Sequence, residues 1–172
     1  AATGYDASEN QFGGFVGLWD VKTGKPVLEK TTDDRGTAIA FSPDGKRVVT
    51  ASEDGTACVW AAQTGRALTP RLRHGASVTE ASFSPDGRSI VTAGYDQEVR
   101  RWNAETGESL GSAFAHGGIV RCVAYGHDGR TIISGDDGPT ARLWDMLSGE
   151  QIGPELPHPA PVHHRAGRKE RL

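Results

Sequence analysis

The chain has 172 residues, of which 36% are hydrophobic and 24% charged, so it has enough apolar side chains for one sizeable core. Its formal net charge of −3 gives no general attraction for nucleic acid or an anionic membrane, so we expect neither as a partner. The 23 glycines and 9 prolines favour short strands joined by tight turns, which predicts an all-β fold.

Residues 1–30 predict a partial structural unit. Here Trp19 is followed five positions later by Gly24, an arrangement that returns farther along the chain. Thirteen positions separate Asp6 from Trp19, whereas six separate the corresponding Asp96 and Trp102. The first unit therefore has about seven extra residues before its tryptophan, which predicts an extended surface loop.

Three full units are predicted next, at 31–72, 73–115 and 116–157. Their tryptophans, Trp60, Trp102 and Trp144, lie 42 residues apart. Within 73–115, runs of β character at 78–83, 88–93, 98–102 and 108–114 are separated by the sequence SPDG and by two further turn signals. Each unit is therefore predicted to form four short antiparallel strands.

The pattern is interrupted in residues 158–172. His158 keeps the repeat spacing, but Gly167 stands where the next aromatic residue should fall, and the remaining residues are polar and basic. We expect a broken repeat start followed by a basic tail, with acidic partners as an alternative role for it. His163 and His164 have no carboxylate or cysteine at ligand spacing, so no metal or other cofactor is predicted.

This pattern resembles the WD-repeat β-propeller family, whose repeats end near a Trp-Asp pair. Trp19-Asp20 and Trp144-Asp145 match that pair, and the stretches PRLRH and PELPH are similar to bacterial members. The resemblance implies an open, incomplete propeller with one partial and three full four-stranded antiparallel blades. Propellers usually close with four to eight blades, so we expect a fragment of a larger propeller, a truncated product, or self-association through the open edges.

The resemblance also implies a hydrogen-bonded brace inside each blade. Its members are a histidine before the first strand, a hydroxyl on the second, an aspartate in the next turn and the tryptophan. The matching sets are His74, Thr92, Asp96 and Trp102; His116, Ser134, Asp137 and Trp144; and Thr50, Asp54 and Trp60, with Thr32 at the histidine position. A hydrolase is the alternative reading of such residues, but catalytic sites are seldom repeated once per structural unit.

Family members of this kind present partner-binding residues on one face of the propeller. The matching positions are Arg35, Glu53, Ser77, Tyr95, Ile119 and Asp136. Tyr95 is the strongest single candidate because an exposed aromatic ring offers a large contact area. The alternative is that these are ordinary surface residues.

We therefore expect a non-catalytic scaffold that binds protein partners, in the cytoplasm. The alternative is that the chain is the propeller portion of a larger bacterial signalling enzyme, such as a serine/threonine kinase, with catalysis outside these residues. Arg101 stands where the other units have Val59 or Leu143, and a charge at such a position needs a partner.

Overall fold

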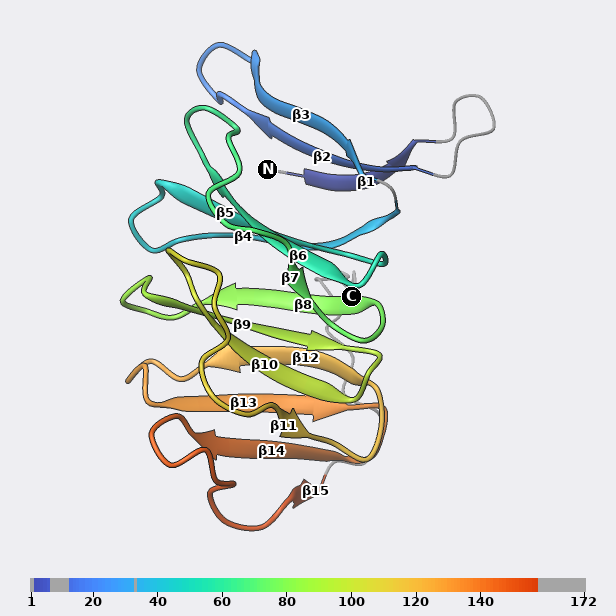
Figure 1. Ribbon diagram of the computed structural model, residues 1–172, viewed down its shortest axis with the longest axis vertical. Helices are drawn as coiled ribbons and strands as arrows, with labels where there is room; N and C mark the ends of the chain where they lie inside the picture. The colour runs from blue at the N-terminus through green and yellow to red at the C-terminus, as the bar shows by residue number, and fades with distance from the viewer. Residues whose placement is uncertain (1, 7–12, 33, 158–172) are drawn as a thin grey trace, which may run out of the picture.

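The computed structural model describes residues 2–6, 13–32 and 34–157, which form strands and turns (Figure 1). The predicted extended loop falls largely on residues 7–12, and the predicted tail falls on residues 158–172. Both therefore lie outside the described residues. The described residues include no helical segment with the length and apolar character needed to cross a bilayer.

The strands form four antiparallel sheets in which neighbours in sequence are neighbours in space. The first sheet contains β1 (Ala2–Asp6), β2 (Gly13–Trp19) and β3 (Pro26–Thr32). The second contains β4 (Gly36–Phe41), β5 (Arg47–Ser52), β6 (Thr56–Ala61) and β7 (Leu72–Arg73). The third contains β8 (Val78–Phe83), β9 (Ser89–Gly94), β10 (Glu98–Asn103) and β11 (Phe114–Ala115). The fourth contains β12 (Val120–Tyr125), β13 (Thr131–Asp136), β14 (Thr140–Asp145) and β15 (Leu156–Pro157).

The sheets are stacked in chain order, with the first and fourth at opposite ends of the molecule (Figure 1). The stack is open, because the fourth sheet does not return to the first. The predicted all-β fold, with one partial and three four-stranded units, is confirmed.

Repeated tight turns join the first two strands of the full units. In the turn after β4, the Ser42 hydroxyl donates to Asp44 Oδ1 at 2.6 Å, and Ser84 donates to Asp86 in the same way after β8. Each turn ends in a glycine with a positive φ, which is 68° at Gly45. A glycine adopts this backbone conformation without the steric cost of a side chain.

The hydrophobic core lies between the sheets. One cluster packs Val49 and Val59 of the second sheet against Ile90 and Trp102 of the third. Corresponding clusters lie between the first and second sheets and between the third and fourth. Burial of apolar surface stabilises a fold roughly in proportion to the area removed from water, so each sheet depends on its neighbours.

Polar side chains also join neighbouring sheets. Thr37 Oγ1 donates to Val78 O, and Thr79 Oγ1 donates to Val120 O, each at 2.6 Å. Arg101 donates through Nε to Leu110 O at 3.1 Å and through Nη1 to Met146 O at 2.6 Å. Two backbone carbonyls, one of them in the neighbouring unit, therefore satisfy the charge that stands at an otherwise apolar position.

Candidate functional site

The third sheet contains a continuous chain of side-chain hydrogen bonds. Trp102 Nε1 donates to Thr92 Oγ1 at 2.8 Å, and Thr92 Oγ1 lies 2.6 Å from His74 Nε2. His74 Nδ1 lies 3.0 Å from both carboxylate oxygens of Asp96, and the Gly75 backbone N–H also donates to this carboxylate at 3.0 Å. The structure therefore brings together the four residues that the resemblance implies.

Hydrogen-bonding chemistry assigns a direction to this chain. The indole N–H of Trp102 only donates, so Thr92 Oγ1 accepts that bond and has its own proton to give to His74 Nε2. His74 is then protonated at Nδ1 and donates to the Asp96 carboxylate. Each polar side-chain atom of Trp102, Thr92, His74 and Asp96 has a hydrogen-bond partner, which offsets the free-energy cost of burying these groups.

Burial controls the charge state of the histidine. It lowers the pKa of His74 below its ordinary 6.5, even though the hydrogen bond to Asp96 acts in the opposite direction. Burial alone would raise the pKa of Asp96, but the hydrogen bonds from His74 and from the Gly75 N–H outweigh that effect and lower it. A neutral imidazole beside an ionised carboxylate fits the direction of the hydrogen bonds.

The fourth sheet repeats this arrangement with a different aspartate from the one predicted. His116 Nε2 lies 2.8 Å from Ser134 Oγ, which accepts from Trp144 Nε1 at 2.7 Å. His116 Nδ1 lies 3.3 Å from Asp136 Oδ2, and Asp136 is only 3% exposed. The assignment of Asp137 to the brace is therefore wrong, as is the assignment of Asp136 to the binding surface.

The two aspartates exchange roles because the fourth unit has Gly138 at the position of Asp96 and Asp136 at the position of Gly94. A Cβ atom built on Gly94 would lie 2.9 Å from His74 Nδ1. A side chain at this position therefore starts beside the imidazole, and Asp136 places its carboxylate there directly.

The second sheet contains part of the arrangement. Trp60 Nε1 donates to Thr50 Oγ1 at 2.9 Å, as predicted for these two residues. Asp54, however, accepts from Thr56 Oγ1 at 2.7 Å and from Arg71 Nη1 at 2.9 Å. Where the histidine is replaced by Thr32, the aspartate is paired with a nearby arginine.

These braces are closed to a substrate. Thr92 is 0% exposed, and the His74 side chain is 0% exposed as well. A nucleophilic hydroxyl must reach the substrate, whereas this one is enclosed between a tryptophan and a histidine. In the part of the chain that the structure describes, no group of three or more His, Cys, Asp or Glu side chains is arranged to hold a metal ion.

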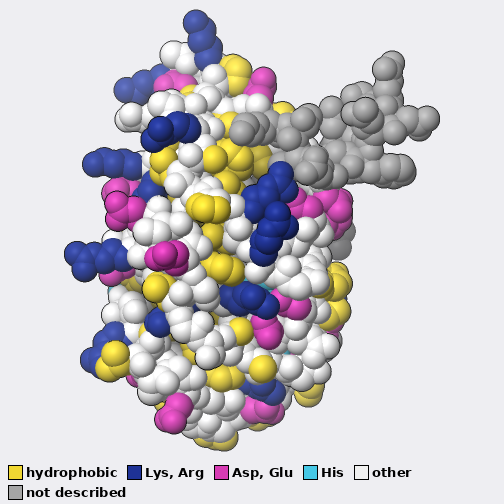
Figure 2. All heavy atoms as spheres, viewed as in Figure 1, with side chains coloured by type: hydrophobic (Ala, Val, Ile, Leu, Met, Phe, Trp, Pro, Cys, Tyr) yellow, Lys and Arg dark blue, Asp and Glu magenta, His cyan; other side chains and the backbone are white. Residues whose placement is uncertain are grey.

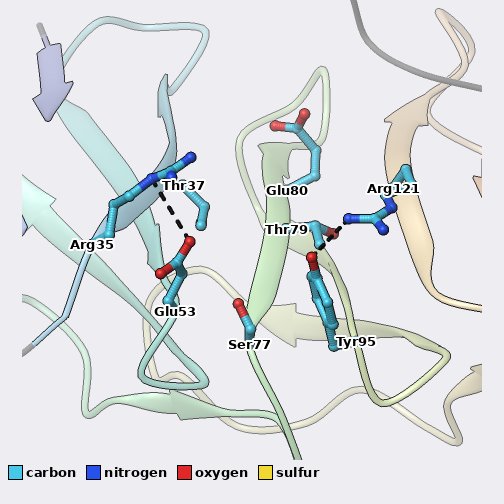
Figure 3. A pocket seen from close by; sticks show the side chains of 8 residues that line it. All are labelled: Arg35, Thr37, Glu53, Ser77, Thr79, Glu80, Tyr95 and Arg121. Atoms are coloured by element: carbon cyan, nitrogen blue, oxygen red, sulfur yellow. Dashed lines mark hydrogen bonds and ion pairs between the residues drawn. The ribbon is translucent and has the colours of Figure 1, made fainter. Parts of the chain in front are cut away.

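The candidate partner-binding face lies where the second strand of each full unit turns into the third. A cavity of about 380 Å³ opens here between the second, third and fourth sheets (Figure 3). Its lining comes from all three: Arg35, Thr37, Glu53, Ser77, Thr79, Glu80, Tyr95 and Arg121. We call these eight residues the turn-face cavity.

The predicted surface residues meet in pairs beside the braces. The backbone N–H of Glu53 donates to Arg35 O, that of Tyr95 to Ser77 O, and that of Asp137 to Ile119 O. Arg35 and Glu53 also form an exposed ion pair at 3.7 Å. Ile119 is partly buried and is not part of the cavity lining. In the third pair, the residue that contacts Ile119 is Asp137 and not the predicted Asp136.

Arg121 organises the cavity around Tyr95. Its Nη1 donates to Tyr95 Oη at 2.8 Å, and its Cζ lies 4.9 Å from the centre of the Tyr95 ring (Figure 3). Asp137 holds the same guanidinium through Nε at 2.5 Å and Nη2 at 2.9 Å, which raises the pKa of Arg121 above its usual range. Tyr95 remains 44% exposed. An exposed aromatic ring is thus held in place by a charged neighbour.

Sequence reasoning did not single out Arg121, Thr37, Thr79 or Glu80. A signal was present, because Thr37, Thr79 and Arg121 are spaced 42 residues apart and share one position of the repeat. Thr37 and Thr79 each bond to the next sheet, whereas Arg121 reaches back to Tyr95 of the preceding sheet.

Comparison with known proteins identifies the repeats. The family model described as "WD domain, G-beta repeat" (WD40) matches residues 32–61, 68–103 and 107–145, which together make up more than half of the chain. No curated protein matches the chain. Each matched segment contains the first three strands of one full sheet, β4–β6, β8–β10 or β12–β14, together with the brace residues of that sheet. The second and third segments begin with β7 and β11, the outermost strands of the preceding sheets. The chain therefore belongs to the WD40 repeat family.

Proposed function

We propose that the chain is a non-catalytic scaffold whose turn-face cavity binds a protein partner. WD40 repeats imply a propeller module that takes part in protein interactions. The observation that carries the proposal is the state of Tyr95, which is 44% exposed yet held by Arg121 at 2.8 Å. A side chain that is ordered before binding loses less conformational entropy when a partner arrives.

The chemistry of the cavity supports a protein ligand. Tyrosine and arginine are enriched at the centres of protein interfaces, and both lie in this cavity. Two arginines and two glutamates line it, so it offers hydrogen-bond donors and acceptors to a polypeptide without strong attraction for one sign of charge. The exposed pair of Arg35 and Glu53 contributes little to stability and is available to exchange partners.

Affinity capture from the source cells tests this proposal. Tyr95→Ala removes the ring, and Arg121→Ala removes the group that holds it. Each should lower the affinity for the bound protein by about thirtyfold, and so reduce its recovery, since interface anchors of this kind are worth roughly 2 kcal/mol.

Leu147→Ala is the matched control, because Leu147 is 85% exposed and lies in a turn at the opposite end of the strands. It should leave recovery unchanged. Equal recovery by all three variants would remove the turn-face cavity from consideration.

A further inference from the structure

The two outer faces of the stack have the residue pattern of an internal interface. Position for position, Ile133 in the fourth sheet corresponds to Val49 and Val91, and Leu156 corresponds to Leu72 and Phe114. Val49 and Val91 are both 0% exposed, because the next sheet covers them, whereas Ile133 is 42% exposed. Leu156 is 47% exposed, against 1% for Leu72 and 6% for Phe114.

The first sheet has the complementary face at the other end of the stack. Trp60, Trp102 and Trp144 each pack into a cluster with residues of the preceding sheet, and they are 9%, 7% and 8% exposed. Trp19 occupies the same position and is 39% exposed. Its ring lies 5.9 Å from that of Phe15, centre to centre, so two aromatic rings share this face.

The internal interfaces show what each outer face accepts. Three times within the chain, a face bearing a tryptophan covers a face bearing aliphatic residues of the preceding sheet. The fourth sheet offers such an aliphatic face, and the first sheet offers such a tryptophan face. Figure 2 shows hydrophobic side chains reaching the surface at both ends of the stack.

The aliphatic face of the fourth sheet is also hollowed. A cavity of about 380 Å³ adjoins it, lined by Cys122, Ala124, Ile133, Gly135 and Ala141 of the fourth sheet and also by residues of β4 and β8, among them Ala40, Glu80 and Ser82. Small side chains leave this hollow beside Ile133.

We propose that two copies of this chain associate head to tail, with the Ile133 and Leu156 face of one packed against the Trp19 face of the other. The contact is heterologous, because it joins two different surfaces. Two such contacts would close a ring containing the four sheets of each copy, eight in total, within the four to eight blades usual for propellers.

Sedimentation velocity on the purified chain tests this proposal. The chain should form a dimer in a concentration-dependent manner. Ile133→Lys and Leu156→Lys each place a charge on the aliphatic face, and Trp19→Glu places one on the tryptophan face. Each variant alone should weaken association by about tenfold or more. Leu147→Lys, at an exposed site on neither face, should dimerise like the unmodified chain. Circular dichroism establishes that each variant is folded.

Mixing the variants separates a head-to-tail contact from other modes. An equimolar mixture of Ile133→Lys and Trp19→Glu should restore a 1:1 complex, because each partner then contributes its intact face. A chain that stays monomeric up to about 100 µM would overturn the proposal. A mixture that fails to associate, although the unmodified chain dimerises, would also overturn it. That result is expected of a self-complementary contact, in which the same face of each copy meets its counterpart.

Discussion

Both buried histidines of the braces have a carboxylate at the Nδ1 atom, and the two carboxylates come from different positions of the repeat. Asp96 reaches His74 from a turn, whereas Asp136 reaches His116 from the last residue of β13. In both units the carboxylate lies at the same place, beside the Nδ1 atom of the histidine. The contact with the histidine is therefore preserved although the aspartate has shifted by two residues.

The exchanged roles of Asp136 and Asp137 make a direct prediction for stability. Asp136→Ala leaves the buried His116 N–H without its acceptor and should lower the free energy of unfolding by about 1–3 kcal/mol. Asp137→Ala breaks an ion pair with Arg121 that is about one third exposed, and should cost about 1 kcal/mol or less. Urea denaturation of both variants measures the difference, and a larger loss for Asp137→Ala would contradict the assignment.

The buried histidines also predict a dependence on pH. Burial lowers the pKa of His74 and His116 in the folded chain, so the unfolded chain binds protons more readily below about pH 6.5. The stabilisation from neutral histidines is complete above that pH and is lost as the pH falls below it. The free energy of unfolding should therefore decrease between pH 7.5 and 5.5.

Denaturation curves at the two pH values provide the measurement. His74→Gln should lower stability at pH 7.5 but reduce the further loss at pH 5.5. His127→Gln changes an exposed histidine in the turn after β12 and should retain the full loss. A chain that becomes more stable on acidification would exclude neutral buried histidines.

At the scale of the strands, the end of β9 depends on a residue without a side chain. A Cβ atom on Gly94 would lie 2.8 Å from Asp96 Oδ1 and 3.0 Å from Ser77 O. Gly94→Ala should therefore push the brace apart and cost about 1–3 kcal/mol. Gly117→Ala is the control, because nothing lies within 4 Å of the added atom. Thermal denaturation compares them, and equal melting temperatures would contradict the tight contact.

The strands were predictable because their landmarks repeat. Tryptophans 42 residues apart and the SPDG turns place three units in register, and the structure has strands at 78–83 and 98–103 where the pattern predicts them. The fourth brace was less predictable, since Asp136 and Asp137 are adjacent and Gly138 replaces the expected aspartate. Spacing alone does not reveal which carboxylate is buried.

The repeat pattern of the sequence also did not predict the contacts between sheets. In the sequence, Arg101 is a charge at an apolar position of the repeat, and in the structure its acceptors are the backbone carbonyls of Leu110 and Met146. Nothing in the residue types at those two positions indicates that role. The same holds for Arg121, whose contact with Tyr95 depends on how two sheets are stacked.

For the whole molecule, the groups that hold the sheets together are different from the exposed groups that line the turn-face cavity. The braces and the clusters between sheets are buried, and they fix the turns that surround the turn-face cavity. The exposed groups at that cavity come from three sheets. A partner bound there would contact several repeats at once, and its affinity would depend on their relative positions being held.

Site-specific photocrosslinking in the source cells tests this most directly. A photoreactive residue replaces Arg35, whose side chain is 61% exposed at the cavity, so that Tyr95 is left intact. The same residue at position 147 reports on the opposite end of the strands. We expect a discrete protein adduct from position 35 that Tyr95→Ala abolishes, and none from position 147. An adduct from position 147 with none from position 35 would contradict a partner at the turn-face cavity.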